Sequence, residues 1–162
     1  MSVLAEVERL LNERPGNQLK TAREGTRRLQ ENRLINAQEA KEINEICKTI
    51  FAAQRGKGDP EAAARRVRQT YERMLDKAAS SPVALAIAGL ASSGPIETPA
   101  GDGASPNVVA APAISRSNRI SLGMVGGVIG GAVIGGAIGG GGGAIIGAVV
   151  GGIAGGIAAA CT

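Results

Sequence analysis

The residues of this chain that could perform chemistry are few, and their types point to association rather than catalysis. The 162 residues include no histidine, which excludes a histidine-based triad and imidazole acid–base chemistry. The two cysteines lie far apart in the sequence and give no zinc site. We expect Cys47 to be a small buried apolar residue, and Cys161 to be either a lipidation site or an inert thiol. The sequence therefore predicts no enzyme, no metal and no cofactor.

A row of glycines marks the C-terminal part of the chain, where residues 120–162 carry no charge. Glycine recurs there at every fourth position, at Gly123, Gly127, Gly131, Gly135, Gly139, Gly143, Gly147, Gly151 and Gly155. Residues four apart stack along one ridge of an α-helix, so this row would form a groove into which another helix backbone packs. The pattern predicts membrane helix packing through a glycine zipper.

Helix propensity indicates why such a segment needs a bilayer or a packed partner. Each glycine in a helix costs about 1 kcal/mol relative to alanine, so the 17 glycines of residues 123–156 would cost about 17 kcal/mol in water. In a bilayer the backbone must bond to itself, which favours the helix. The run Gly139–Gly143 leaves residues 120–138 and 144–160, about 28 and 26 Å long as helices, against a hydrocarbon core of about 30 Å. We expect a transmembrane helical hairpin; one long or re-entrant helix and an aggregating strand are the alternatives.

Charge and composition divide the chain into three parts. Residues 1–81 contain 16 Lys and Arg against 12 Asp and Glu, so they hold the whole net charge of +4. Residues 92–117 are rich in Pro, Gly, Ser and Ala, which is typical of a mobile linker. We expect an interaction domain at 1–91, this linker, and a membrane segment at 118–162. Because the N-terminus does not resemble a signal peptide, the expected location is an intracellular membrane with the N-terminal domain in the cytoplasm.

The first 91 residues read as short helices with clear breaks. Apolar residues recur at spacings of three and four, and the expected helices cover residues 2–13, 17–33, 37 onward, 61–79 and 83–90. The helix from residue 37 either continues or kinks into a separate helix containing Cys47 and Phe51.

Two of these helices have recognisable first turns, and one of the two has a predicted buried face. Asn36 and Glu39 form the pattern of a capping box, and Asp59 with Pro60 forms an N-cap followed by proline at the first helical position. In the helix after Pro60 we expect four inward-facing residues, namely Val67, Tyr71, Met74 and Leu75.

Three blocks of this half, at residues 29–39, 55–62 and 81–90, carry a resemblance to a known family. They read LQENRLINAQE, RGKGDPEA and SPVALAIAGL, and their order and spacing resemble a caspase recruitment domain (CARD) of the death-fold superfamily. The resemblance implies a six-helix bundle over residues 1–91 that assembles with its own kind through opposing charged patches. Its implied partners are CARD-containing proteins such as a caspase, a receptor or an adaptor, together with self-association.

The charged residues that such homotypic contacts would use form three clusters. They are Lys20, Arg23, Arg27 and Arg28; Glu39, Glu42 and Glu45; and Arg65, Arg66 and Arg68. Neighbouring helices of opposite sign could dock against copies of themselves, and such patches fix the register of an encounter. Nucleic-acid binding is not expected, because an acidic helix adjoins the first basic one.

Together these features predict a membrane-tethered death-fold adaptor that regulates apoptotic or innate immune signalling. The bilayer would be its second partner, and the zipper could cluster neighbouring molecules. The alternative is a toxin or effector whose glycine zipper assembles into a pore, because the tail resembles glycine-zipper bacteriocins and pore-forming effectors in composition.

Overall fold

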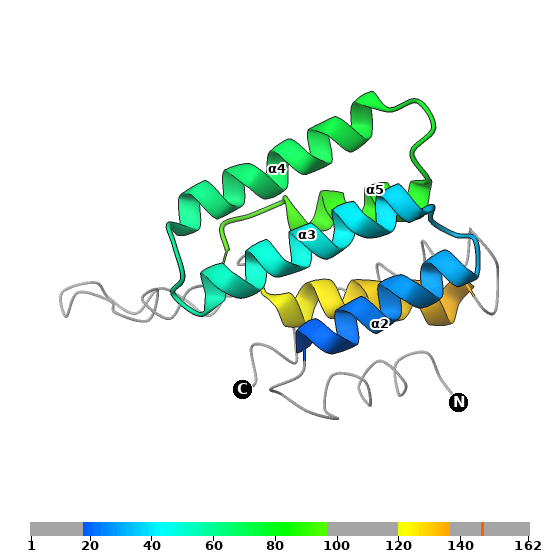
Figure 1. Cartoon of the computed structure of the whole chain (residues 1–162), viewed down its shortest axis with the longest axis horizontal. Coiled ribbons are helices and arrows are strands. Elements are labelled where there is room, and N and C mark those ends of the chain that lie inside the picture. The colour runs from blue at the N-terminus through cyan, green and yellow to red at the C-terminus, as the bar shows by residue number, and fades with distance from the viewer. Residues whose placement is uncertain (1–17, 97–119, 137–146, 148–162) are drawn as a thin grey trace.

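The protein is all-α throughout the residues that its structure, a computed structural model, describes: 18–96, 120–136 and 147. Five helices make up this part, namely α2 (Gln18–Glu31), α3 (Ala37–Gln54), α4 (Pro60–Asp76), α5 (Pro82–Ala91) and the helix of residues 122–136 (Figure 1). These residues contain no strand; a single parallel bridge joins Ile96 to Ile120. The all-α prediction is confirmed here, whereas the expected helix at 2–13, most of the linker and the Gly139–Gly143 turn lie outside the described residues.

Local capping determines where the helices begin. Asn36 and Glu39 form the predicted capping box: the Glu39 amide donates to Asn36 Oδ1 at 2.9 Å, and the Asn36 amide donates to Glu39 Oε2 at 2.8 Å. From this cap α3 continues unbroken to Gln54, so the alternative with a kink is wrong. Asp59 accepts from the first two amides that follow Pro60, as its position predicted.

The core is built around α3, which packs against α2, α4 and α5. Its fully buried side chains include Ile43, Ile46 and Ile50. On α4, Val67 and Met74 are buried as predicted and Tyr71 is half-buried, but Leu75 is 51% exposed and its prediction as a core residue is wrong. Adjacent helical residues point about 100° apart, so α4 can direct only one of Met74 and Leu75 toward α3.

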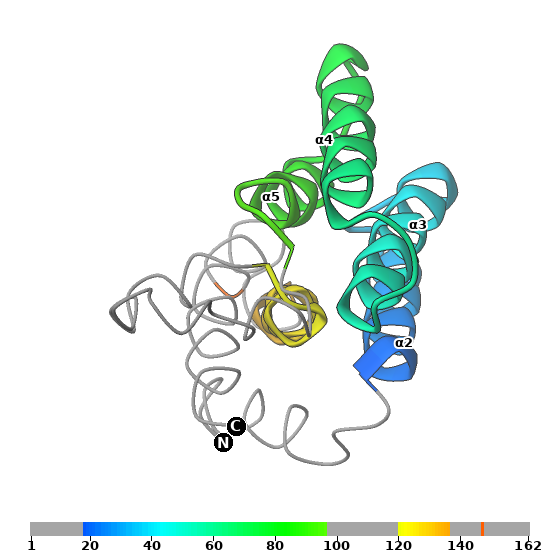
Figure 2. The same ribbon diagram turned by 90° about the vertical axis from the view of Figure 1, so that its left-hand side faces the viewer.

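The glycine-rich helix of residues 122–136 belongs to the same hydrophobic core as the charged half of the chain. Its buried residues, Leu122, Val125, Val128, Ile129 and Ala132, join one cluster with those of α2 to α5. It runs alongside α2, with α5 on its other side (Figures 1 and 2). None of the helices in the described residues is long and apolar enough to cross a bilayer.

Polar contacts fix the start of this helix. The Ile120 amide donates to the Pro95 carbonyl at 2.8 Å, and the Leu122 amide donates to Gln54 Oε1 at 2.8 Å. The first bond ties the helix to the segment after α5, and the second ties it to the C-terminal end of α3. The start of the glycine-rich helix is therefore attached to residues far from it in the sequence.

Candidate functional site

The glycine-rich helix meets α2 at a position where only glycine leaves room. A Cβ atom on Gly25 would lie 2.6 Å from Ile129 Cγ2 and 4.0 Å from Val133 Cγ2. Carbon atoms in favourable contact are about 3.5–4.0 Å apart, so any larger residue at position 25 would have to displace Ile129. Gly25 thus sets how closely α2 covers this helix.

The glycine row itself makes a backbone contact within the described residues. A Cβ atom on Gly147 would overlap the Gly131 carbonyl oxygen, and would lie 2.8 Å from the Gly131 carbonyl carbon and 3.1 Å from Gly135 Cα. Gly131 and Gly147 would be about 24 Å apart on one straight helix, so residue 147 does not continue the 122–136 helix in line. Three members of the row therefore meet backbone against backbone, an approach that the lack of side chains allows.

The remaining members of the row are less informative. Gly127 is buried, and a Cβ on Gly123 would lie 3.4 Å from the side-chain nitrogen of Gln18. Four further members, Gly139, Gly143, Gly151 and Gly155, lie outside the described residues.

The basic cluster of α2 lies on the exposed side of that helix. Lys20, Arg23, Arg27 and Arg28 are all exposed, as predicted. Within the described residues, no ion pair involves Lys20 or Arg23, whereas the two arginines at 27 and 28 are paired along their own helix.

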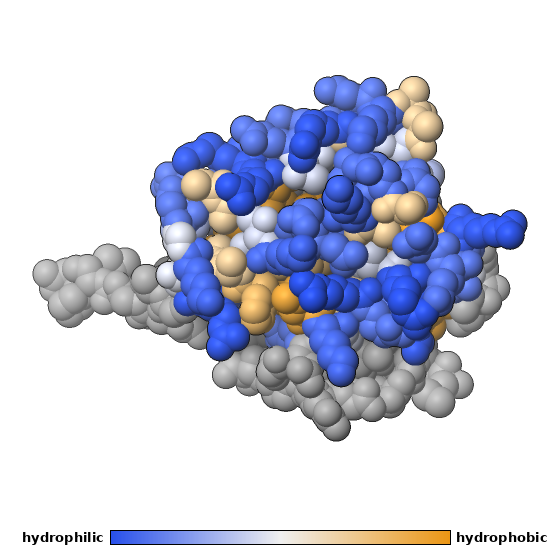
Figure 3. Space-filling model, in the orientation of Figure 1, coloured by the Kyte–Doolittle hydropathy of each residue, from blue (hydrophilic) through white to orange (hydrophobic). Residues whose placement is uncertain are grey.

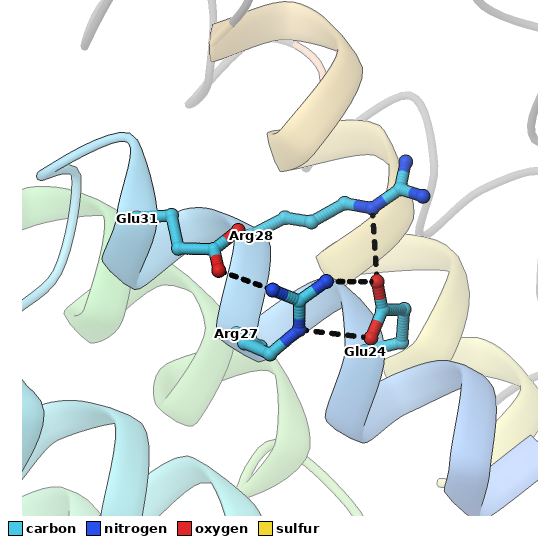
Figure 4. Close-up of polar contacts among 4 residues, drawn as sticks. All are labelled: Glu24, Arg27, Arg28 and Glu31. Carbon is cyan, nitrogen blue, oxygen red and sulfur yellow. Dashed lines mark hydrogen bonds and ion pairs between the residues drawn. The ribbon is translucent and has the colours of Figure 1, made fainter.

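Figure 4 shows this pairing. The Arg27 guanidinium donates to both Glu24 oxygens, Nη2 to Oε1 at 2.6 Å and Nε to Oε2 at 3.0 Å, and also to Glu31; Arg28 Nε donates to Glu24 Oε1 at 3.3 Å. Hydrogen bonding from Arg27, with a smaller contribution from Arg28, lowers the pKa of Glu24 to about 2, and Glu24 in turn raises the pKa of Arg27. Part of the positive charge of α2 is thus neutralised locally.

The acidic cluster expected on the neighbouring helix does not form a surface, which corrects the sequence interpretation. Glu39 is 4% exposed and Glu42 is 9% exposed, because their spacing places them on the stripe of α3 that faces the core. Glu39 Oε1 accepts from the Ser81 amide at 2.6 Å and Oε2 from the Ser81 hydroxyl at 3.1 Å, while Glu42 Oε1 accepts from Lys77 Nζ at 2.8 Å. Both carboxylates hold the start of α5 and the end of α4 against α3.

Only Glu45 of that cluster is exposed, and it accepts from Lys48 Nζ at 2.8 Å. This hydrogen bond lowers the pKa of Glu45. The spacing of Glu39 from Ile43 and Ile46 was the signal that could have revealed its burial.

The third cluster lies on α4, away from α2. Arg65, Arg66 and Arg68 are exposed, and Arg65 approaches Asp59 at 3.7 Å and Glu61 at 3.8 Å. α2 and α4 lie on different sides of α3 (Figures 1 and 2), so the fold does not bring the two basic clusters together.

The described part of the chain contains no candidate metal site. Its Cys, Asp and Glu residues include no group of three that could hold a metal ion. Cys47 is buried as predicted, and burial raises the pKa of its thiol to about 12, so it is neutral at physiological pH.

Sequence reasoning missed Gly25 and Gln54, which link distant parts of the chain. Gly25 had a signal: glycine inside an otherwise polar helix costs about 1 kcal/mol and suggests a close approach by another element. The arrangement that results is an uncharged helix, packed through glycine, beneath a helix whose outer side is basic. In comparisons with known proteins, no family model, no curated protein and no solved structure matches the chain.

Proposed function

We propose that the protein inserts its glycine-rich segment into lipid bilayers and permeabilises them, and that the helical bundle masks this segment beforehand. One observation carries the proposal: the uncharged helix of residues 122–136 is buried against α2, a helix with a charged outer side. The proposal takes up the pore-forming alternative, because a constitutive anchor does not require such cover.

The cost of forming a glycine-rich helix in water supports a segment that can move from the protein core into a bilayer. Seven glycines in residues 122–136 cost about 7 kcal/mol relative to alanine as a helix in water, so the helix depends on its packing. A bilayer removes that dependence, because the backbone there has to bond within the helix. Burial in the bundle and burial in lipid are therefore alternative ways to stabilise the same helix.

The glycine contact indicates how the segment would pack after insertion. Gly147 lies against Gly131 and Gly135 without intervening side chains, which is the contact type that stabilises helix pairs in lipid. In our proposal residues 120–138 and 144–160 form a helical hairpin in the membrane, and further copies associate through the unused glycines to open a pore.

An engineered disulfide between α2 and the glycine-rich helix tests the proposal. A Cβ on Gly25 would lie 3.8 Å from Ile129 Cβ, which matches the mean Cβ separation of about 3.8 Å in disulfides. The variant Gly25→Cys/Ile129→Cys, in a Cys161→Ser background, should therefore lock the two helices together when oxidised. Cys47 is retained because its buried, neutral thiol does not compete.

The assay is release of an encapsulated dye from liposomes. We expect release by the parent protein and by the reduced double variant, little release by the oxidised variant, and recovery after reduction. The two single-cysteine variants under oxidising conditions are the matched controls. Equal release by the oxidised and reduced forms, or no release by the parent protein on any vesicle, would refute the proposed function.

The death-fold adaptor remains a second candidate, supported by the exposed cations of α2 and α4 on an all-helical fold. It would bind CARD-containing proteins at an intracellular membrane and regulate apoptotic or innate immune signalling. Burial of Glu39 and Glu42 leaves only Glu45 of the predicted acidic cluster exposed for such contacts. The substitutions Arg27→Glu and Arg28→Glu should abolish self-association in light scattering, and unchanged assembly would exclude this use of α2.

A further inference from the structure

We infer that the outer face of α2 is a docking surface for anionic lipid headgroups, and that docking there precedes release of the glycine-rich helix. The inference rests on the proposed function, since it names the surface that first meets the bilayer. The observation behind it is that one helix has a basic outer side and covers the uncharged helix with its inner side.

The cations on this face are close together. At 100° per residue, Arg23, Arg27 and Lys20 fall within an arc of about 60° on the helix, about 100–160° round from the buried Ala22. Long basic side chains on one exposed arc can reach one plane together, as contact with a flat membrane surface requires. Figure 3 shows hydrophilic residues along the visible side of the bundle, including α2.

Part of this charge is available for a partner. Lys20 and Arg23 have no ion pair within the described residues, and α2 as a whole carries four basic residues against Glu24 and Glu31. Among the described residues the only large apolar side chain that is exposed is Leu75, which lies on α4. Docking by α2 is therefore electrostatic, and the face offers no aromatic side chain on which a nucleic-acid base could stack.

The inner side of α2 explains how docking would lead to release. Its apolar residues are only Leu19, Ala22 and Leu29, of which Leu19 is partly exposed. α5, in contrast, is apolar along nearly its whole length. α2 thus holds its place with fewer apolar side chains than α5, and its displacement toward headgroups would expose Ile129 and Val133 next to the bilayer.

Two matched double variants test this surface. The variant Lys20→Gln/Arg23→Gln removes two charges from α2, and Arg66→Gln/Arg68→Gln removes two from α4; all four residues are exposed and without an ion pair in the described part of the chain. Binding is measured by co-sedimentation with vesicles of phosphatidylcholine, with and without phosphatidylglycerol. About 1 kcal/mol per basic residue near an anionic surface predicts a roughly 30-fold loss of affinity for the α2 variant. The α4 variant should bind about as tightly as the parent.

Binding is measured on both the parent and the oxidised Gly25→Cys/Ile129→Cys protein, so that docking is separated from insertion. Docking of the oxidised protein that depends on phosphatidylglycerol and on Lys20 and Arg23 supports the surface, even if no dye is released. The proposed docking surface would be overturned if the α2 and α4 variants lost affinity equally, or if the protein bound vesicles with and without phosphatidylglycerol equally well. Dye release would remain an independent test of the proposed function. Preferential binding of the same face to duplex DNA in competition would likewise overturn the lipid assignment.

Discussion

Substituting Gly25 with alanine tests the central contact, because the structure provides a matched control at Gly126. Both glycines lie inside helices, so both changes gain about 1 kcal/mol of helix propensity. Around Gly126 no atom of the described residues, apart from the neighbouring backbone of its own helix, lies within 4 Å of an added Cβ, whereas at Gly25 the added Cβ lies 2.6 Å from Ile129 Cγ2. The difference between the two variants therefore isolates the cost of the clash.

The size of that cost follows from the stiffness of Ile129. A contact of 2.6 Å is about 1 Å shorter than a favourable carbon–carbon distance, and a β-branched residue in a helix has one strongly preferred rotamer. Ile129 cannot turn away cheaply, so the helices must separate or strain. Overpacking of this kind costs about 1–3 kcal/mol.

We expect Gly126→Ala to raise the free energy of unfolding by about 1 kcal/mol. The free energy of unfolding of the Gly25→Ala variant should be about 1–3 kcal/mol lower than that of the Gly126→Ala variant. The assay is urea unfolding of the full chain followed by far-ultraviolet circular dichroism. Adding Ile129→Ala to Gly25→Ala should recover part of the loss in a double-mutant cycle. If Gly25→Ala stabilises the protein as much as Gly126→Ala does, α2 does not cover the glycine-rich helix at this point.

Three further predictions follow from the polar and thiol groups. Glu39→Ala should lower the free energy of unfolding by about 1–3 kcal/mol by leaving buried donors unsatisfied, whereas Glu45→Ala should change it by less than about 0.5 kcal/mol; comparable effects would contradict the burial of Glu39. Glu24 should titrate near pH 2 in carbon-detected NMR, and Arg27→Gln should raise that midpoint. Because the pKa of Glu24 is lower in the folded protein than in the unfolded chain, the stabilising effect of Glu24 is present above pH 4.5 and disappears as the pH falls toward 2. Cys47 should resist iodoacetamide until the protein is unfolded, and rapid labelling of native Cys161→Ser protein would refute its burial.

Local signals predicted where α3 and α4 begin, because capping residues are present there, whereas α4 ends at Asp76 and not at the predicted residue 79. The capping box of Asn36 and Glu39, and the Asp59–Pro60 start of α4, are made by residues within four positions of each other, so the sequence contains all the information they need. The spacing of Glu39 from Ile43 and Ile46 also indicated burial, but the partners of Glu39 and Glu42 could not be predicted locally, because they come from the end of α4 and the start of α5.

For the contact between α2 and the glycine-rich helix, the sequence predicted the glycine row but not the helix that packs against it. The spacing of the glycines by four predicted a ridge for close helix packing, and Gly131, Gly135 and Gly147 make such a contact. The sequence could not show that the same helix would also pack beneath α2. Glycine permits close approach in a bilayer and in a protein core alike, so the pattern does not distinguish the two environments.

The sequence by itself thus determined the helices, their caps, the absence of charge in residues 120–162 and the glycine ridge, since each of these depends on neighbours within a turn or two. Only the tertiary structure decided what lies against the ridge and which charges remain exposed. The contact of Gly25 with Ile129 joins distant parts of the chain, and the hydrogen-bond partner of Glu39, Ser81, lies at the start of another helix. Such pairings arise from the packing of whole helices, which no local pattern specifies.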